Sequence, residues 1–390
     1  MTISLMAIAA AITFIISTSY SMSIYDGLVA DVQQRAEMYT KLEQIDTYVR
    51  SYYDGTIDED ALIESLADAY IDVLGSNDAE YYDAFEYTLY REHLSGTHLG
   101  IGIYAEEVGG CPQITHVIAN SPAAAAGLAV GESIIEINGE SVLEMGYDRA
   151  YALLRAESGT PLMLTIRSGG VDRSVSVSTI QMTVASVRTD IFGSYGYIQV
   201  YEFSEKTYQQ FIAAYSMLLS SDVKGIIIDL RNNTGMIFEP VFNLLNVLLP
   251  PGSVPYIETE LTGESSEADP ASGDNAITIP VAILVNSRTS GPAELMAVSL
   301  HDGLGSAWVI GSSTAGNAEL SEIFDLYDST AIGIPVATLS TTHTSFSGTG
   351  VQPDYEIAMA ADTPADLIKL DENTDACIKK AIEVISQTAN

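Results

Sequence analysis

Basic side chains are scarce in this sequence. Lysine and arginine together number 16 against 52 aspartates and glutamates, which gives a formal net charge of −36. So negative a chain repels nucleic acid and anionic lipid, because binding to either depends on cationic contacts with phosphate groups. We therefore expect no nucleic-acid partner.

Cysteines and cofactor motifs are also few. Cys111 and Cys377 lie far apart and outside any metal-ligand spacing. We expect two unrelated thiols, with a single disulfide as the alternative. The sequence contains no phosphate-binding P-loop, no G-x-G-x-x-G fingerprint and no metal-binding histidine pair. It therefore predicts no cofactor and no metal site.

Charge is absent from the first 25 residues, and residues 3–20, ISLMAIAAAITFIISTSY, are long enough to cross a bilayer as a helix. A cleaved signal peptide normally has a basic start and a small-residue cleavage site, but the first basic residue is Arg35 and no A-x-A pattern is clear. We expect residues 1–25 to be a membrane anchor that places the rest outside the cytoplasm, at a cell surface or in a periplasm-like compartment. A cleaved signal, which would make the protein secreted, and a buried core helix are the alternatives.

The remainder divides into three parts by its hydrophobic pattern. Residues 26–96 show apolar residues at helical spacing, with Asp58 as a cap for the second helix. Residues 97–182 contain short β-rich runs and one helical segment. Residues 183–390 alternate apolar strands with helices, which predicts a sheet covered on both faces, and they end in a helix. Residues 263–276 read as an acidic loop.

Six stretches, in this order, resemble the carboxyl-terminal processing peptidases, which are membrane-associated serine peptidases with a PDZ domain. They are YYDGTIDEDALIESLADAYIDVLGSNDAEYY, GIGIYA, VIANSPAAAAGLAVGESIIEINGESV, YIQVYEFSEKTYQQF, GIIIDLRNNTG and GTGVQPDYEI. The resemblance covers roughly residues 40–390. It implies a multidomain α/β protein with an N-terminal helical region, a PDZ domain and a crotonase/Clp-protease-like α/β core of the tail-specific protease type.

The PDZ resemblance implies a peptide-binding loop at Leu99, Gly100, Ile101 and Gly102. Successive backbone N–H groups there would receive the terminal carboxylate of a protein tail, because glycine permits a close approach. The peptide would then add as a strand to the edge of the sheet. A glycine-rich strand start without ligand is the alternative for this stretch.

The catalytic positions of the family are substituted in this chain. The family uses a serine nucleophile that a lysine base activates. With Val285 and Glu294 in register, the nucleophile position is Gly291, and the base position is Asn317. A family glutamine four residues beyond the lysine falls on Ser321. These departures put the serine–lysine dyad in doubt.

Three nearby hydroxyls, Ser287, Thr289 and Ser290, raise the alternative of a shifted nucleophile. No lysine occurs between Lys224 and Lys369, so no local base is available to Ser290. His301 would lie about 16 Å from Ser290 along a helix, too far for a hydrogen bond. We interpret the stretch as a helix start.

Three residues account for that helix start. Gly291 is the expected cap, Pro292 the first helical residue and Glu294 a carboxylate at the positive end of the helix dipole.

The oxyanion position also departs from the family pattern. A glycine pair after D-L-R-x-N-x lends a backbone N–H to the oxyanion in the family, whereas this chain has Gly235 followed by Met236. For Asp229 and Arg231 we expect an internal ion pair or a loop brace.

Two functions follow from these observations. The first is a membrane-anchored protein of this type that binds C-terminal tails and does not cleave them by the family mechanism. The second is an active serine endopeptidase with a shifted nucleophile, Ser290. The missing lysine near Ser290 favours the first.

Overall fold

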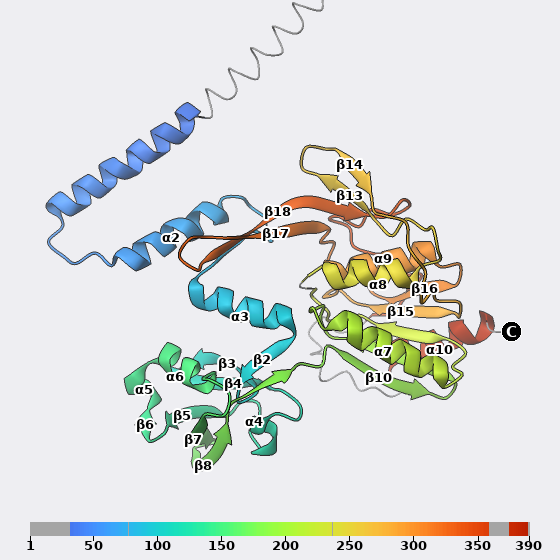
Figure 1. The fold of residues 1–390 in the computed structure, drawn as a ribbon, viewed down its shortest axis with the longest axis horizontal. Helices are drawn as coiled ribbons and strands as arrows, with labels where there is room; N and C mark the ends of the chain where they lie inside the picture. The colour runs from blue at the N-terminus through green and yellow to red at the C-terminus, as the bar shows by residue number, and fades with distance from the viewer. Residues whose placement is uncertain (1–31, 77, 236, 359–373, 389–390) are drawn as a thin grey trace, which may run out of the picture. The chain divides into compact units, whose positions relative to one another are not determined.

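The computed structural model describes residues 32–76, 78–235, 237–358 and 374–388 (Figure 1). The chain forms two compact units, residues 1–66 and residues 67–390, and each is treated by itself. The predicted anchor at residues 1–25 and Met236 lie outside the described residues. Among the helices that the structure describes, none is both long and apolar enough to cross a membrane.

The described part of the first unit, residues 32–66, is mainly helical. One helix covers residues 32–52, and α2 (Glu59–Asp72) begins after Asp58, whose Oδ1 accepts the N–H of Ala61 at 3.1 Å, as the sequence predicts. Arg50 joins the two helices through an ion pair with Glu59 at 2.6 Å, although both side chains are largely exposed. Such an exposed pair contributes little to stability, because water and salt screen the two charges.

The second unit begins at Ala67 within α2, and the next element is a strand that the helical prediction missed. After α2, residues Glu80–Tyr82 form β1, and α3 (Ala84–Ser95) follows with Asp83 as its cap. The Asp83 carboxylate accepts two backbone N–H groups of the first turn, from Phe85 and Glu86, and α3 ends at Gly96 in the left-handed conformation. β1 pairs with β18 (Ala331–Ser340), which lies far along the sequence and could not be seen in local periodicity.

A small β-domain follows α3. Its sheet has the order β3-β4-β5-β7-β8, with β6 beside β5. Alternating burial along β7 and β8 places one face of the sheet on the core, where α6 buries Ala150, Tyr151 and Leu154. β2 and β9, which are the first and last strands of this domain in the sequence, pair with each other as a separate two-stranded sheet. The bounds are β2 (Thr97–Gly100), β3 (Ile103–Val108), β4 (Cys111–Val117), α4 (Pro122–Ala125), β5 (Ser133–Ile137), β6 (Glu140–Ser141), α5 (Val142–Met145), α6 (Tyr147–Leu154), β7 (Pro161–Ser168), β8 (Val171–Ser178) and β9 (Ile180–Thr183).

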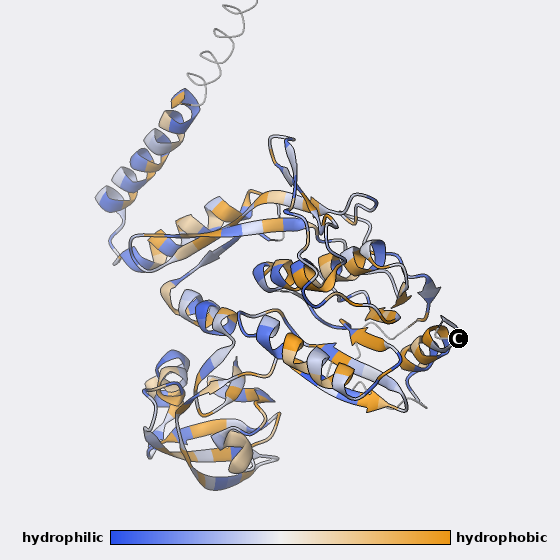
Figure 2. Cartoon of the chain, turned by 45° about the vertical axis from the view of Figure 1, so that its right-hand side comes forward, coloured by the Kyte–Doolittle hydropathy of each residue, from blue (hydrophilic) through white to orange (hydrophobic). Residues whose placement is uncertain are grey.

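The larger domain is built on a six-stranded sheet of order β10-β11-β12-β15-β16-β19, in which every neighbouring pair except β10–β11 is parallel. Its central strands β12 and β15 are fully buried and are apolar except for Asp229 at the end of β12, and Figure 2 shows the apolar residues as orange ribbon. The bounds are β10 (Val187–Phe192), β11 (Tyr195–Val200), α7 (Thr207–Ser220), β12 (Ile226–Asp229), α8 (Glu239–Leu248), β15 (Val281–Val285), α9 (Pro292–Gly303), β16 (Ala307–Gly311), β19 (Tyr355–Glu356) and α10 (Ala376–Thr388).

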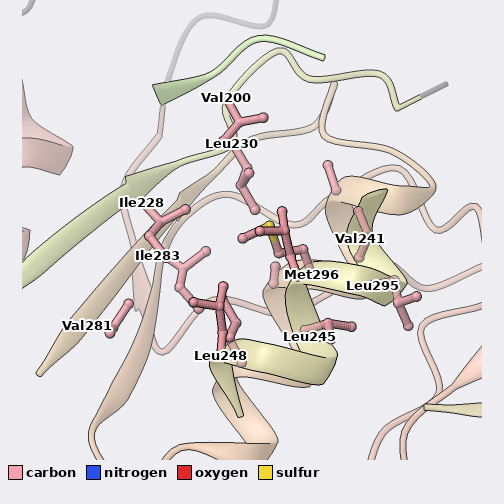
Figure 3. Packing of buried hydrophobic residues seen from close by; sticks show 14 of the residues in the cluster. Val200, Ile228, Leu230, Val241, Leu245, Leu248, Val281, Ile283, Leu295 and Met296 are labelled. Carbon is pink, nitrogen blue, oxygen red and sulfur yellow. The ribbon is translucent and has the colours of Figure 1, made fainter. Parts of the chain in front are cut away.

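Both faces of this sheet are covered, as predicted. Side chains of α7, α8 and α9 form one core with the inward residues of the strands, and Figure 3 shows Leu245 and Leu248 packed towards Ile283. On the other face Ile378 and Ile385 of α10 pack against the alternate residues of the same strands. Burial of each such side chain stabilises the fold by about 1.5–3 kcal/mol.

A second sheet in this domain was not predicted. It has the order β1-β18-β13-β14, with β17 also paired to β18. The bounds are β13 (Ile257–Glu260), β14 (Ser265–Glu267) and β17 (Glu319–Asp325). The prediction of a loop over residues 263–276 is therefore wrong at β14. This polar segment has no strand pattern of its own, and it forms a strand because it pairs with β13.

Candidate functional site

The loops after two neighbouring parallel strands meet at one edge of the six-stranded sheet. Gly235 follows β12, and Ser290 follows β15. A Cβ atom added to Gly235 would lie 2.5 Å from Cδ of Pro292 and 3.2 Å from the carbonyl oxygen of Ser290, so only glycine fits there. The N–H of Ser290 donates to the Asn233 carbonyl at 3.0 Å. The structure thus brings the predicted oxyanion and nucleophile positions together, where ligands of such sheets bind.

Gly291 begins α9 as predicted. It is the N-cap with φ 56° and ψ −117°, Pro292 is the first helical residue, and the Gly291 N–H donates to Oε2 of Glu294 at 3.0 Å. This backbone conformation strains any side-chain-bearing residue. Space is nevertheless available, since a Cβ atom at Gly291 would have only Cζ of Phe238 nearby, at 3.9 Å.

Glu294 connects this helix start to the loop that carries Asn317. Its carboxylate is fully buried and accepts the backbone N–H groups of Gly316 at 2.6 Å and Asn317 at 2.8 Å, as well as the hydroxyl of Thr314. Burial raises the pKa of Glu294, and the hydrogen bonds from these donors oppose that rise. One carboxylate therefore holds the predicted nucleophile and base positions next to each other.

The Asn317 side chain is occupied by structural contacts. Its Oδ1 accepts the N–H of Glu319 at 3.0 Å, and its amide hydrogen-bonds to the carboxylate of Asp78. Burial raises the pKa of Asp78, the bond to Asn317 lowers it, and the nearby charge of Glu319 raises it. Ser321, at the family glutamine position, donates to the Asp78 carbonyl at 3.3 Å. Residues 317 and 321 thus brace the segment around Asp78.

The N–H of Gly235 is also engaged, because it donates to Oδ1 of Asn233 at 2.9 Å. Asn233 is buried and its own amide donates to the Val200 carbonyl at 3.0 Å. The N–H predicted to face an oxyanion is therefore held by a side chain of its own loop. The expected effect of Met236 lies outside the described residues.

None of the three hydroxyls in the loop before α9 has a base beside it among the described residues. Thr289 is buried and donates to the Leu230 carbonyl at 2.9 Å, Ser287 is exposed, and Ser290 is half-buried. His301 sits in the last turn of α9, where its ring nitrogens contact Asp302 at 3.1 Å and Asp354 at 3.3 Å. That placement agrees with a satisfied histidine at a helix end.

Asp229 and Arg231 form the internal ion pair that the sequence predicts. The Arg231 guanidinium contacts Asp229 at 2.6 Å with both side chains fully buried, and it contacts Asp375 at 2.8 Å. Tyr197 donates its hydroxyl to Asp229 at 2.6 Å, and burial raises the pKa of Tyr197. Asp375 also accepts N–H groups at the start of α10, so the network fastens the last helix to the sheet.

In the predicted peptide-binding loop of the small domain, two residues belong to a paired strand and two lie between strands. Leu99 and Gly100 belong to β2 and pair with β9, whereas Ile101 and Gly102 lead into β3. Gly102 has φ 90°, and a Cβ atom there would lie 2.1 Å from Cβ of Ser121. The Ile101 N–H already donates to the Leu154 carbonyl at 3.1 Å, so it is not free as the prediction requires.

At the edge of β3, where a peptide strand would add, one backbone group already has a hydrogen-bond partner within the protein. β3 is at the end of its sheet, with β4 as its only partner among the described strands. The hydroxyl of Tyr147, on α6, donates to the Ala105 carbonyl of β3 at 3.0 Å. Sequence reasoning missed this contact, because no local pattern connects a tyrosine with a strand 42 residues earlier.

A cavity of about 730 Å³ lies beside Gly291 and Asn317. Its walls come from β1, α3, α8, β17 and the loops after β11, β12 and β15. Among the described residues that line it, none is lysine, arginine or histidine. The described part of the site therefore offers a large concave surface without a lysine or histidine to activate a nucleophile.

Comparisons with known proteins support the assignment of the two domains. Peptidase family S41 matches residues 194–357, and the PDZ domain matches residues 113–168. Carboxy-terminal processing protease CtpA of Bacillus subtilis is 31% identical over 303 residues, which are 77% of this chain and 64% of that protein. The carboxy-terminal-processing protease of Bartonella bacilliformis is 26% identical over 316 residues, 79% of this chain and 72% of that protein.

One solved structure, described as an S41 protease of Bacteroides fragilis, covers 83% of this chain and 90% of its own, with a TM-score of 0.51 and 18% identity. This likeness concerns the fold. Together the matches confirm the predicted α/β class with a PDZ domain. The chain spans a little under two thirds of the length of the Bacillus subtilis relative.

Proposed function

Because the chain belongs to the carboxyl-terminal processing peptidases of family S41, we propose that it binds the C-terminal tails of extracytoplasmic proteins and does not cleave them by serine–lysine chemistry. The PDZ domain receives the free carboxylate of the tail at its predicted loop, residues 99–102, and binding there requires the Ile101 N–H to leave the Leu154 carbonyl. Residues 1–25, which carry no charge, attach the protein to a membrane.

The identity of residue 291 carries this proposal. Glycine has no side chain that can attack a carbonyl carbon, and Asn317 in place of the base has an amide that takes no proton at neutral pH. Ser290 is the alternative nucleophile. No lysine or histidine lies among the described residues lining the adjacent cavity, which disfavours an enzyme that pairs Ser290 with either base.

Hydrolysis and binding assays on the full chain test the proposal. We expect no cleavage of unfolded protein substrates and no labelling by serine-directed phosphonates. We expect peptides with a free carboxylate and an apolar last residue to bind at least tenfold more tightly than their amidated forms, since amidation removes the charge that the loop receives.

The opposite outcomes are equally clear. Proteolysis that disappears in Ser290→Ala would replace this proposal with the shifted-nucleophile enzyme. Equal binding of free and amidated peptides would remove the tail-capture part of the proposal.

A further inference from the structure

The cavity beside Gly291 is lined by several carboxylates, and none of its described lining residues carries a positive charge. Six carboxylates line it, and none of them forms an ion pair within the described part of the chain. They are Asp78, Glu80, Glu205, Glu239, Glu319 and Glu322. Like charges that share one cavity repel, and a bound cation would relieve that repulsion.

Aromatic rings form a second part of the wall. Tyr82 and Tyr90 lie with their ring centroids 4.8 Å apart, and Phe238 and Phe242 stack at 5.9 Å. Aromatic faces attract cations, and they also pack against the aliphatic stem of a long basic side chain. The combination of carboxylates and rings therefore suits an organic cation.

The volume of the cavity and the arrangement of its carboxylates favour an organic cation over a metal ion. The volume of about 730 Å³ falls within the range of roughly 300–1,000 Å³ that is usual for ligand sites. No group of three histidine, cysteine or carboxylate side chains in the described residues is arranged to hold a metal ion. A bulky cation with a hydrophobic stem fits these walls better than a bare ion.

We propose that this cavity, called the acidic cavity below, holds a lysine or arginine side chain of the polypeptide that the protein binds. The inference rests on the proposed function, because the polypeptide is the tail that the PDZ domain captures. Gly291 lies in the wall of the cavity, so the bound segment passes the former nucleophile position. The acidic cavity thereby selects tails that carry a basic residue at a defined distance from their end.

Peptide binding to the full chain tests this selection. A set of fluorescent 14-residue peptides shares one apolar C-terminal residue with a free carboxylate, and a single arginine is moved along the remaining positions. Each peptide has a partner in which citrulline, of similar shape and no charge, replaces the arginine. We expect at least one arginine position to bind tenfold or more tightly than its citrulline partner, and raising the salt concentration should reduce that ratio.

Two triple variants locate the effect. Glu205→Gln, Glu239→Gln and Glu322→Gln together remove three exposed carboxylates of the acidic cavity. Glu260→Gln, Glu264→Gln and Glu267→Gln remove the same charge from exposed positions on the β13–β14 hairpin, outside the cavity. We expect the first variant to lose the preference for arginine and the second to keep it.

The outcomes separate this inference from tail capture. If arginine and citrulline peptides bind equally at every position while amidation weakens binding, tail capture stands and the acidic cavity has no such role. If the arginine preference persists in the cavity variant, it arises elsewhere and the inference is overturned. Binding of spermine without any preference among peptides would assign the cavity to a free polyamine instead, and no binding of any peptide would overturn both proposals.

Discussion

The Glu294 carboxylate accepts the backbone N–H of Asn317 through an Oε2···N distance of 2.8 Å. The same oxygen accepts the N–H of Gly291 at 3.0 Å. Residues at the predicted base and nucleophile positions are thus joined through one buried side chain. The backbone around these two predicted positions is therefore held by Glu294 and does not depend on the side chains of residues 291 and 317.

Removing this carboxylate should destabilise the larger domain. Glu294→Ala leaves several buried donors without an acceptor, so we expect the free energy of unfolding to fall by about 3–5 kcal/mol. Glu294→Gln keeps one acceptor oxygen, and its loss should be smaller, about 1–3 kcal/mol. Urea denaturation measures both, with the exposed Glu260→Gln as control, expected within about 0.5 kcal/mol of the parent. A Glu294→Ala chain as stable as that control would contradict this role.

Restoring hydrolysis should require two substitutions together. Gly291→Ser has room for its side chain, and Asn317→Lys supplies the missing base. Because nucleophile and base act as a unit, either substitution alone should give no activity above the parent. The double variant should react with a serine-directed phosphonate, and Met236→Gly is a third change to add if cleavage of a protein substrate stays absent.

The parent chain and both single variants are the controls for this experiment. Gly291→Ser places a side chain at φ 56°, which costs about 1–3 kcal/mol, so its folding is checked by thermal denaturation. If the single Gly291→Ser variant cleaves the protein substrate as fast as the double variant, a base other than residue 317 activates the serine hydroxyl introduced at position 291.

Peptide affinity of the PDZ domain should rise when Tyr147 loses its hydroxyl. In the present structure this hydroxyl occupies the Ala105 carbonyl, which an added peptide strand would need. We expect Tyr147→Phe to increase affinity about two- to tenfold, because one net hydrogen bond of about 0.5–1.5 kcal/mol no longer has to be broken. Fluorescence anisotropy with a free-carboxylate peptide measures this. Tyr327→Phe, at a side chain 94% exposed, is the matched control. Lower affinity in Tyr147→Phe would mean that the hydroxyl contacts the peptide.

Stability should depend on pH through His93. Its Nε2 lies 2.6 Å from Oε2 of Glu202, and this hydrogen bond raises the pKa of His93 against the opposing effect of burial. A histidine whose folded pKa is raised adds stability below the unfolded value of about 6.5 and loses it as pH rises through the folded pKa. His98 stays neutral in this range, because burial lowers its pKa to about 4.

We therefore expect His93→Gln to lower the free energy of unfolding more at pH 6 than at pH 9. The His93 side chain is 41% exposed, so solvent screening limits the difference to about 1 kcal/mol or less. Denaturant titrations at the two pH values measure it, with the exposed His116→Gln as control. An equal loss at both pH values would exclude the charged pair as its source.

Local sequence determined the elements that position the site. Continuous apolar runs at β12 and β15 predicted buried parallel strands, since only a sheet covered on both faces hides such segments. Gly291, Pro292 and Glu294 predicted the start of α9, because capping depends on residues within one turn. The order of motifs indicated the family, and the identities of residues 291 and 317 predict the absence of serine–lysine chemistry, which stays a prediction.

Only the tertiary structure decided what surrounds those positions. Asp78 reaches the site across 243 residues of sequence through its contact with Ser321, and β1 joins β18 over a similar separation. The sequence analysis expected the N–H groups of Ile101 and Gly235 to be free for a ligand. In the fold they donate to the Leu154 carbonyl and to Oδ1 of Asn233. Hydrogen-bond partners and cavity walls are set by chain segments distant in sequence. Periodicity and spacing report only neighbours along the chain, and so they could not reveal the acidic cavity.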